Sequence, residues 1–125
     1  MKTALALLII VFNSALGFCQ VAEFSFEEKT TFKFPKTKEG EMLSHDYHFT
    51  NSGDAPLIIS EYKVSCKCTK AIFPKDPIMP GESGKIRVEF DTKGKIAWQD
   101  RTVEIYSNAK KNPQKLRFKV MVENE

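Results

Sequence analysis

Apolar and polar residues alternate one by one in three stretches of this chain, residues 42–51, 85–90 and 115–122. Because successive side chains of a β-strand point to opposite faces, this pattern predicts strands with one buried and one solvated face. Glycine, proline, asparagine and aspartate residues mark turns between these stretches and several shorter ones, and no segment after residue 20 carries a convincing helical pattern. The spacing predicts an all-β sandwich of seven or eight short antiparallel strands.

The apolar positions of these stretches define the expected core. They share one face of each strand, so they meet where two sheets pack together. The predicted core residues are Phe49, Ile59, Ile86, Val88, Phe90, Ile105 and Phe118. Residues 20–125 suffice for one domain around one such core.

Residues 1–19 have the pattern of a secretory signal peptide and are not expected to join the fold. Lys2 precedes an unbroken apolar run, residues 4–12, which is too short to remain as a membrane span. The small residues Ala15 and Gly17 predict cleavage between residues 17 and 20. No second apolar run follows, so we expect an exported protein without a transmembrane segment in its mature chain.

A lipid anchor at Cys19 is the alternative to simple removal of the signal. The sequence Leu16-Gly17-Phe18-Cys19 places a cysteine after a Leu-Gly pair, as lipoprotein signals do. Phe18 is bulky for the position before a lipidated cysteine, so an ordinary removed signal is favoured. The expected location is the periplasm, the cell surface or the exterior.

The charge distribution argues against a nucleic-acid partner. The formal net charge is +3, and the basic residues are spread along the chain instead of forming a patch with interleaved aromatics. Lys110 and Lys111 lie between Asn108 and Pro113, in what reads as a solvated polar turn. We therefore expect an unknown protein or envelope partner, and the sequence leaves the oligomeric state open.

Five short motifs, taken together, resemble a bacterial family. In chain order they are N-x-G-D-A-P-L-I-I, S-C-x-C-T, P-I-x-P-G-E, F-D-T-K-G-K and I-Y-S-N, starting at residues 51, 65, 77, 90 and 105. The set is similar to a domain-of-unknown-function family that is abundant in secreted proteins of Bacteroidetes-type bacteria. That family resembles the HYDIN and ASH immunoglobulin-like domains and, more distantly, PapD-like domains. The resemblance covers roughly residues 32–122 and implies an immunoglobulin-like β-sandwich and an exported location, but no reaction.

Cys66 and Cys68 are the candidates for chemistry. In an oxidising compartment, a local disulfide or a pair of buried thiols is the favoured interpretation. Residues i and i+2 of an extended strand have Cα atoms roughly 6.5 Å apart, so a bond requires the chain to kink after Val64. Two alternatives stay open. One is a redox-active pair, because a strained bond across so small a ring is easily reduced. The other is a Cu(I) site built from soft thiolates.

The residue between the cysteines adds to these alternatives. The family commonly has Cys-Gly-Cys, whereas this chain has Lys67 at the middle position. The lysine argues against any role of the cysteine pair that needs a flexible glycine at the middle position. The ammonium of Lys67, which lies between the two cysteines in sequence, is also able to lower the pKa of a cysteine thiol.

The histidines and one triad-like run do not extend this candidate site. His45 and His48 are three positions apart, so on a strand they point to opposite faces and cannot chelate a metal together. His45 is expected in the core and His48 on the surface. Ser44, His45 and Asp46 have the letters of a catalytic triad, but adjacent strand residues alternate faces and cannot line up. We predict no catalytic residue, no cofactor and, apart from the cysteine alternative, no metal site.

Trp98 lies in the expected connection between residues 93 and 101. An aromatic side chain on a loop is able to anchor a partner, and the alternative is that it folds back to cap the sandwich. We therefore expect an exported, non-catalytic, immunoglobulin-like binding or assembly module. The alternative function is a periplasmic thiol-redox or copper-handling protein that uses Cys66 and Cys68.

Overall fold

The computed structural model describes residues 20–124. The expected signal peptide, its cleavage site and the alternative anchor at Cys19 lie outside the described residues. Within the described residues the chain forms nine strands and no helix. No helix in that part of the chain is long and apolar enough to cross a membrane.

The strands follow the alternating stretches and the shorter apolar runs between turns. Their bounds are β1 Phe24–Phe26, β2 Thr31–Lys33, β3 Thr37–Lys38, β4 Met42–Asn51, β5 Ile59–Val64, β6 Thr69–Ile72, β7 Ser83–Asp91, β8 Ala97–Ser107 and β9 Gln114–Glu123.

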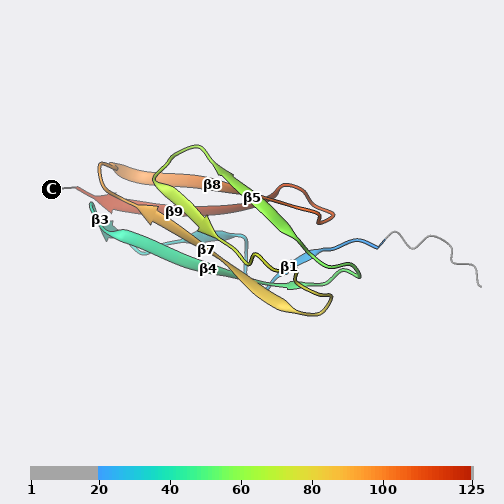
Figure 1. The fold of residues 1–125 in the computed structure, drawn as a ribbon. Helices are drawn as coiled ribbons and strands as arrows, with labels where there is room; N and C mark the ends of the chain where they lie inside the picture. The colour runs from blue at the N-terminus through green and yellow to red at the C-terminus, as the bar shows by residue number, and fades with distance from the viewer. Residues whose placement is uncertain (1–19, 125) are drawn as a thin grey trace, which may run out of the picture.

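Two sheets pack face to face and form the sandwich (Figure 1). The first has the order β1-β4-β7-β6, and the second has the order β2-β9-β8-β5 with β3 also beside β9. Figure 1 shows β4 and β7 in one layer and β5, β8 and β9 in the other. The prediction of an all-β sandwich is confirmed.

The N-terminal segment passes from one sheet to the other. β1 pairs antiparallel with β4, whereas β2 and β3 pair parallel with β9. The structure therefore has nine strands where the spacing predicts seven or eight, and two of its pairings are not antiparallel. Alternation shows which face of a strand is buried but not which neighbour the strand pairs with. The sequence pattern therefore could not predict that the N-terminal segment changes sheets.

All seven predicted core residues are buried. Phe90 on β7 and Phe118 on β9 come from opposite sheets, and their ring centroids are 5.1 Å apart. Tyr47 on β4 also reaches across the core, where its hydroxyl donates to the carbonyl oxygen of Arg117 on β9 at 2.7 Å. Burial raises the pKa of this phenol well above its ordinary value. Aromatic packing and a hydrogen bond from the buried Tyr47 thus join the two sheets.

The turn after β4 is built around Asn51, whose side chain is fully buried. Its amide nitrogen donates to the carbonyl oxygens of Ala55 and Ile78 at 2.8 and 2.9 Å. Its amide oxygen accepts from the backbone N–H groups of Gly53 and Glu23 at 3.0 and 3.3 Å. A primary amide offers two donors and two acceptor lone pairs, so every polar site of this buried side chain has a partner.

Gly53 is required in this turn because another segment passes close to it. A Cβ atom at this position would overlap the carbonyl oxygen of Val21 and lie 2.8 Å from the Cα of Ala22. The backbone N–H of Val21 donates to the carboxylate of Asp54 at 2.7 Å, and the N–H of Asp54 donates back to the carbonyl of Val21 at 3.0 Å. The run Asn-Ser-Gly-Asp therefore fixes the N-terminal segment of the domain as well as reversing the chain.

Candidate functional site

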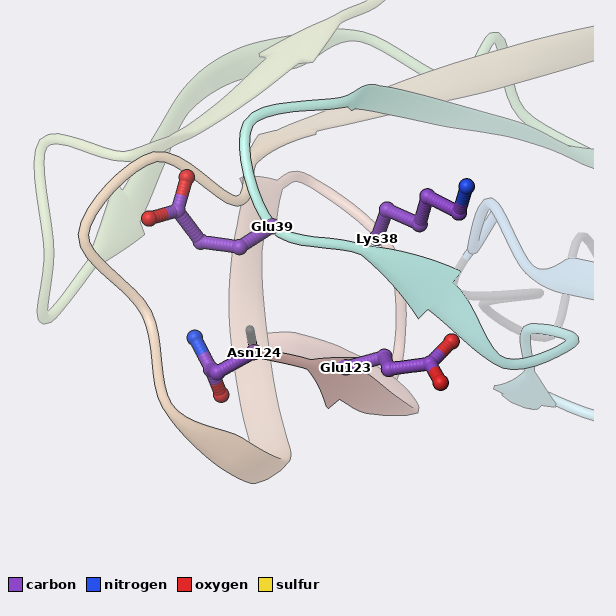
Figure 2. Close-up of a pocket in the computed structure, with 4 residues that line it drawn as sticks. All are labelled: Lys38, Glu39, Glu123 and Asn124. Carbon is purple, nitrogen blue, oxygen red and sulfur yellow. The ribbon is translucent and has the colours of Figure 1, made fainter.

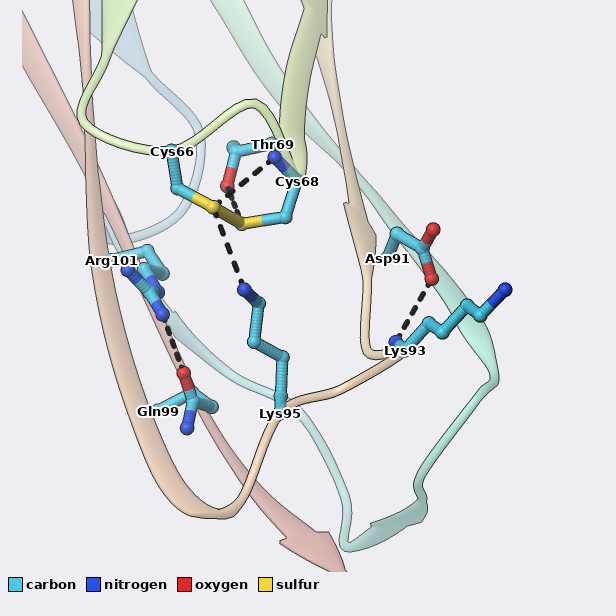
Figure 3. Close-up of a disulfide and its surroundings, with 8 residues drawn as sticks. All are labelled: Cys66, Cys68, Thr69, Asp91, Lys93, Lys95, Gln99 and Arg101. Atoms are coloured by element: carbon cyan, nitrogen blue, oxygen red, sulfur yellow. Dashed lines mark hydrogen bonds between the residues drawn. A yellow bond between two sulfur atoms is a disulfide. The ribbon is translucent and has the colours of Figure 1, made fainter.

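Both cysteines lie in the connection between β5 and β6, residues 65–68, which we call the cysteine turn (Figure 3). The sulfur atoms of Cys66 and Cys68 are joined, and their Cα atoms are 5.2 Å apart. The chain leaves the extended conformation after Val64. The Cα separation is therefore shorter than the roughly 6.5 Å of an extended strand and falls within the usual disulfide range.

The two sulfur atoms have unequal surroundings. Sγ of Cys66 accepts from the backbone N–H of Cys68 at 3.2 Å and from Nζ of Lys95 at 3.6 Å. The polar neighbour of Sγ of Cys68 is the hydroxyl of Thr69, at 3.7 Å. The positive charge therefore lies beside Cys66 (Figure 3).

Lys95 comes from the connection between β7 and β8, and its backbone is held on both sides. Its N–H donates to the carbonyl of Thr92 at 3.0 Å, and its carbonyl accepts from the side-chain amide of Asn124 at 2.8 Å. Thr92 is fully buried, and its hydroxyl donates to the carbonyl of Glu41 at 2.6 Å. Lys93, two positions earlier, points away from the disulfide in Figure 3. The fold thus directs one of two neighbouring lysines to the sulfur.

A second cation, Arg101 on β8, lies in the surroundings of the disulfide (Figure 3). Its Nη2 donates to Oε1 of Gln99 at 2.7 Å, and its guanidinium lies 5.8 Å from the ring centroid of Phe90. Its Nε is buried and has no hydrogen-bond partner among the described residues. The pairing of β5 with β8 ends at Val64 opposite Val103, so β8 continues past the end of β5 and carries Arg101 to the cysteine turn.

Lys67, which the sequence places between the cysteines, is exposed. Among the described residues no hydrogen bond joins its ammonium to either sulfur, whereas Lys95 makes that contact from 29 positions away in sequence. Local sequence therefore did not indicate the lysine that contacts the sulfur, and an effect of Lys67 on the thiols stays a prediction. The usable signal was the motif F-D-T-K-G-K, which ends at Lys95 and which the fold brings against the motif S-C-x-C-T.

The histidines stand apart from the cysteine turn. The ring of His45 is partly buried and stacks on Phe32 with centroids 3.5 Å apart, and His48 is exposed. Burial is the main reason why the pKa of His45 is lowered. Asp46 is held by Arg87 at 2.9 Å, and this hydrogen bond lowers the pKa of the Asp46 carboxyl. In the described residues no three His, Cys, Asp or Glu side chains converge as a metal site.

Trp98 is the second residue of β8 and not part of a loop, contrary to the sequence prediction. It pairs with Met121 on β9, and its side chain is 45% exposed on the outer face of the sheet. The ammonium of Lys33 lies 5.4 Å from the ring centroid. Trp98 therefore does not fold over the end of the sandwich, and its role in binding a partner stays a prediction.

An apolar groove lies between β5 and β6, the edge strands of the two sheets. We call it the edge groove; its volume is about 520 Å³ and it is lined by Glu61, Tyr62, Lys70, Ala71, Ile72, Phe73 and Lys75. The rings of Tyr62 and Phe73 meet edge to face with centroids 6.5 Å apart, and Ile72 is 45% exposed. Sequence reasoning did not identify this groove, because nothing in the alternation shows that the two edge strands share one side of the sandwich.

The lysines of the edge groove have no ion pair among the described residues. The ammonium of Lys75 lies 4.1 Å from the ring centroid of Phe73, and Lys70 stands on β6. Glu61 is the one carboxylate of the lining. The groove therefore combines an aromatic floor with an excess of positive charge.

A larger and polar pocket lies where β3 meets the end of β9 (Figure 2). Its volume is about 740 Å³, and its lining residues are Lys38, Glu39, Glu123 and Asn124. All four are exposed, and Figure 2 shows the two carboxylates pointing away from each other. Glu123 pairs with Lys36 at 3.9 Å and the two carboxylates do not converge, so the edge groove and the cysteine turn are the better candidates.

The sequence and the fold match one family and several solved structures. A model of the family described as protein of unknown function DUF1573 matches residues 24–122. No curated protein matches the chain at a significant level.

Two solved structures resemble most of the chain. The crystal structure of a protein of unknown function from Porphyromonas gingivalis W83 is 18% identical with a TM-score of 0.68, over 86% of this chain and 50% of that chain. The ASH/PapD-like domain 7 of human CEP192 is 11% identical with a TM-score of 0.63, over 84% of this chain and 88% of that chain.

A third similar structure belongs to a much longer protein. The secreted serine protease VesC from Vibrio cholerae is 17% identical with a TM-score of 0.59, over 90% of this chain and 25% of that chain. The chain thus spans about half of the Porphyromonas protein and a quarter of VesC. At these identities the likeness shows the fold alone.

Proposed function

The chain belongs to the DUF1573 family of proteins of unknown function, and we propose that it works as an exported, non-catalytic binding module. The observation that carries the proposal is the edge groove, an apolar and positively charged channel between two edge strands. The occupant that fits it is an extended segment of a partner protein, with apolar side chains and an acidic flank.

The backbone of the edge strands supports an extended occupant. Among residues 20–124, β5 pairs only with β8 and β6 pairs only with β7, so each strand has one side without a partner strand in this part of the chain. Unpaired N–H and C=O groups along such a side are able to bind an added strand. The two open sides flank the same groove, so a segment that pairs with either strand also passes over Tyr62 and Phe73.

The side chains of the groove support the chemistry of the occupant. The partly exposed ring of Tyr62 and the exposed side chain of Ile72 offer apolar contact area above the buried ring of Phe73. Lys70 and Lys75 have no carboxylate partner among the described residues, so an acidic flank would supply one. Lysines on an edge also oppose pairing between identical chains, which favours a different protein over a second copy.

The absence of catalysis belongs to the proposal. The letters of a triad at Ser44, His45 and Asp46 occupy consecutive positions of β4, so their side chains alternate between its two faces. His45 stacks on Phe32, and Asp46 is held by Arg87. These contacts support a structural role for each side chain and leave no nucleophile paired with a base.

Site-specific photo-crosslinking in the native cell envelope tests the groove. A photoreactive amino acid placed at Ile72 is expected to capture a protein partner. The same residue placed at Met42, which is 62% exposed on β4 outside the groove, is expected to capture none. Trp98 serves as a third position, because it is the sequence-predicted anchor. Capture at Trp98 or Met42 without capture at Ile72 would overturn the assignment of the groove.

A charge reversal tests the acidic flank. Lys70→Glu with Lys75→Glu is expected to reduce crosslinking from Ile72 by roughly fivefold or more, because both cations face the occupant. Lys111→Glu with Lys115→Glu makes the same change in charge away from the edge groove and is expected to leave the yield unchanged. Equal yields in the two variants would contradict charge recognition in the groove.

The exported location is tested by the mature N-terminus. Fractionation followed by mass spectrometry is expected to find the protein in the envelope or the medium, starting at residue 18, 19 or 20. A lipid found on Cys19 would show that the protein is a lipid-anchored protein and that the signal is not simply removed. An intact Met1 in the cytoplasmic fraction would overturn export.

A further inference from the structure

We propose that the Cys66–Cys68 disulfide exchanges with small acidic thiols, and that Lys95 makes Cys66 the sulfur that leaves. This redox activity goes beyond the binding of a partner in the edge groove and does not depend on it. It rests on the charge beside one sulfur, on a second cation close by, and on the small ring that the bond closes.

The unequal surroundings of the sulfurs set the direction of attack. When a disulfide opens, the bonding electron pair goes to the leaving sulfur, and a sulfur with better anion stabilisation leaves faster. Cys66 has the ammonium of Lys95 at 3.6 Å and the N–H of Cys68 at 3.2 Å. The polar contact of the Cys68 sulfur is a neutral hydroxyl at 3.7 Å. Attack at Cys68 with departure of Cys66 is therefore the favoured path.

The exchange balances in two steps. In the first step, the thiolate of the small thiol bonds to Sγ of Cys68, the S–S bond breaks, and Cys66 becomes a thiolate beside Lys95. In the second step, another thiolate attacks the small-molecule sulfur of this mixed disulfide, and Cys68 leaves as a thiolate. Two thiols become one disulfide, and the protein gains the two electrons. The two protons that the thiols lost are available to the protein thiols.

The surroundings select the class of thiol. Lys95 touches the bond, and Arg101 lies in its surroundings with Nε buried and without a partner among the described residues. Lys67 adds an exposed ammonium between the two cysteines. Within the described residues no hydrogen bond joins a carboxylate to either sulfur, and the carboxylate of Asp91, which Figure 3 draws in these surroundings, accepts from the backbone N–H of Lys93 at 3.0 Å. A thiol that carries carboxylates is therefore attracted, and glutathione is a suitable probe.

Opening of the bond leaves the fold in place. Cys66 and Cys68 are two positions apart, so the closed ring restricts few conformations of the unfolded chain. Both residues are only partly buried, and Cys68 also packs against the hydrophobic core, so a small thiol reaches the bond from its exposed side. The protein therefore survives reduction, as a reversible redox site must.

Trapping of the mixed disulfide identifies the attacked sulfur. The oxidised protein is treated briefly with glutathione, free thiols are blocked with iodoacetamide, and the protein is digested with trypsin. Cleavage after Lys67 places the two cysteines in different peptides. We expect glutathione on Cys68 and the acetamide group on Cys66. Glutathione mainly on Cys66, or no mixed disulfide, would overturn the proposal.

The role of Lys95 is tested against its neighbour Lys93. Lys95→Met keeps an unbranched side chain of nearly the same length and removes the charge, and it is expected to slow reduction by glutathione about three- to tenfold. Lys93→Met removes the same charge from the same loop but from a side chain that points away from the disulfide (Figure 3). Its rate is expected to equal that of the wild type. Equal slowing by both variants would overturn the assignment to Lys95.

Single-cysteine variants measure the same contact without a disulfide. In Cys68→Ser the thiol of Cys66 is expected to titrate about one pH unit below the thiol of Cys68 in Cys66→Ser. Lys95→Met is expected to remove this difference. Equal values in the two single-cysteine variants would contradict the proposal even if reduction were fast.

Comparison of thiols tests the preferred substrate class. The rate of each thiol with the protein is divided by its rate with an unstructured Cys-x-Cys peptide disulfide. This ratio is expected to be higher for glutathione than for cysteamine, which is cationic. A reversed order would overturn the preference for acidic thiols. These assays use no binding partner, so their failure is distinguishable from failure of the groove crosslinks.

Discussion

The two turns that flank β5 are held in different ways. The turn before β5, residues 51–54, is organised by a buried amide that has a partner for every donor and acceptor. The turn after β5, the cysteine turn, is partly exposed and is closed by a bond between two residues of the same turn. Beside it stand a lysine in contact with sulfur and an arginine whose Nε has no partner among the described residues.

The comparison assigns stability to the turn before β5 and reactivity to the turn after it. Loss of the buried amide would remove four hydrogen bonds from backbone groups that are buried or partly buried, which is costly. Loss of the disulfide would release only a small ring, which costs little. The turn of Asn51 is therefore a structural element, and the cysteine turn is free to react without unfolding the domain.

The largest expected effect comes from the core and not from either turn. Phe90→Ala, at the end of the core near the cysteine turn, is expected to lower the free energy of unfolding by roughly 3–5 kcal/mol, because it leaves a cavity where a fully buried ring was. Phe49→Ala, near Asn51, is expected to have an effect of the same size. Urea unfolding measures both. A change within about half a kcal/mol for Phe90→Ala would show that the core does not extend under the cysteine turn.

The second effect separates the turns directly. Asn51→Ala is expected to lower the free energy of unfolding by about 2–4 kcal/mol, because four backbone groups each lose a hydrogen bond and, of the four, the carbonyl of Ile78 keeps the N–H of Leu57. Asn108→Ala is a matched control, since its side chain also makes two backbone hydrogen bonds but is exposed. Its effect is expected to be at most about 1 kcal/mol. Equal losses would mean that burial of the amide is unimportant.

The third effect is smaller. Replacement of both cysteines, Cys66→Ser with Cys68→Ser, is expected to lower the free energy of unfolding by no more than about 1–2 kcal/mol, because the ring is small. Chemical denaturation under non-reducing conditions measures it. A loss as large as that of Asn51→Ala would make the cysteine turn a structural element and remove the contrast between the turns.

The smallest effect is a dependence of stability on pH through His45. Burial lowers its pKa in the folded state below the ordinary value of 6.5, so the unfolded chain binds the proton more readily. The stability that the folded protein gains from neutral, partly buried His45 is fully present above about pH 6.5 and is lost as the pH falls through the lower folded-state pKa. His45→Gln is expected to flatten this part of the stability profile. An unchanged slope would assign the pH dependence to other groups.

Local pattern was sufficient to predict the core and insufficient to predict the site. Phe90 and Phe118 were identifiable because alternation within one strand marks its buried face. Trp98 was placed in a loop because the inward positions of the next residues hold Gln99 and Arg101, which break the alternation. Those positions are polar because β8 runs past the end of β5 to the cysteine turn.

Contacts between distant segments had no local signature. Lys95 reaches Cys66 across 29 positions, and the edge groove joins strands from different sheets. Both depend on which edges and loops the topology brings to the same place. The pair Cys66 and Cys68 was itself recognisable, since two cysteines one residue apart are visible in the sequence.

Hydrogen exchange of the oxidised and reduced protein tests the separation of the two turns most directly. Backbone amides in both turns are hydrogen-bonded, including Gly53 to the side chain of Asn51 and Thr69 to the carbonyl of Cys66. On reduction we expect faster exchange at Cys68 and Thr69 only, with the amides of residues 51–54 still exchanging as slowly as in the oxidised protein. Loss of protection in residues 51–54 on reduction would show that the disulfide supports the whole fold, and would contradict the account.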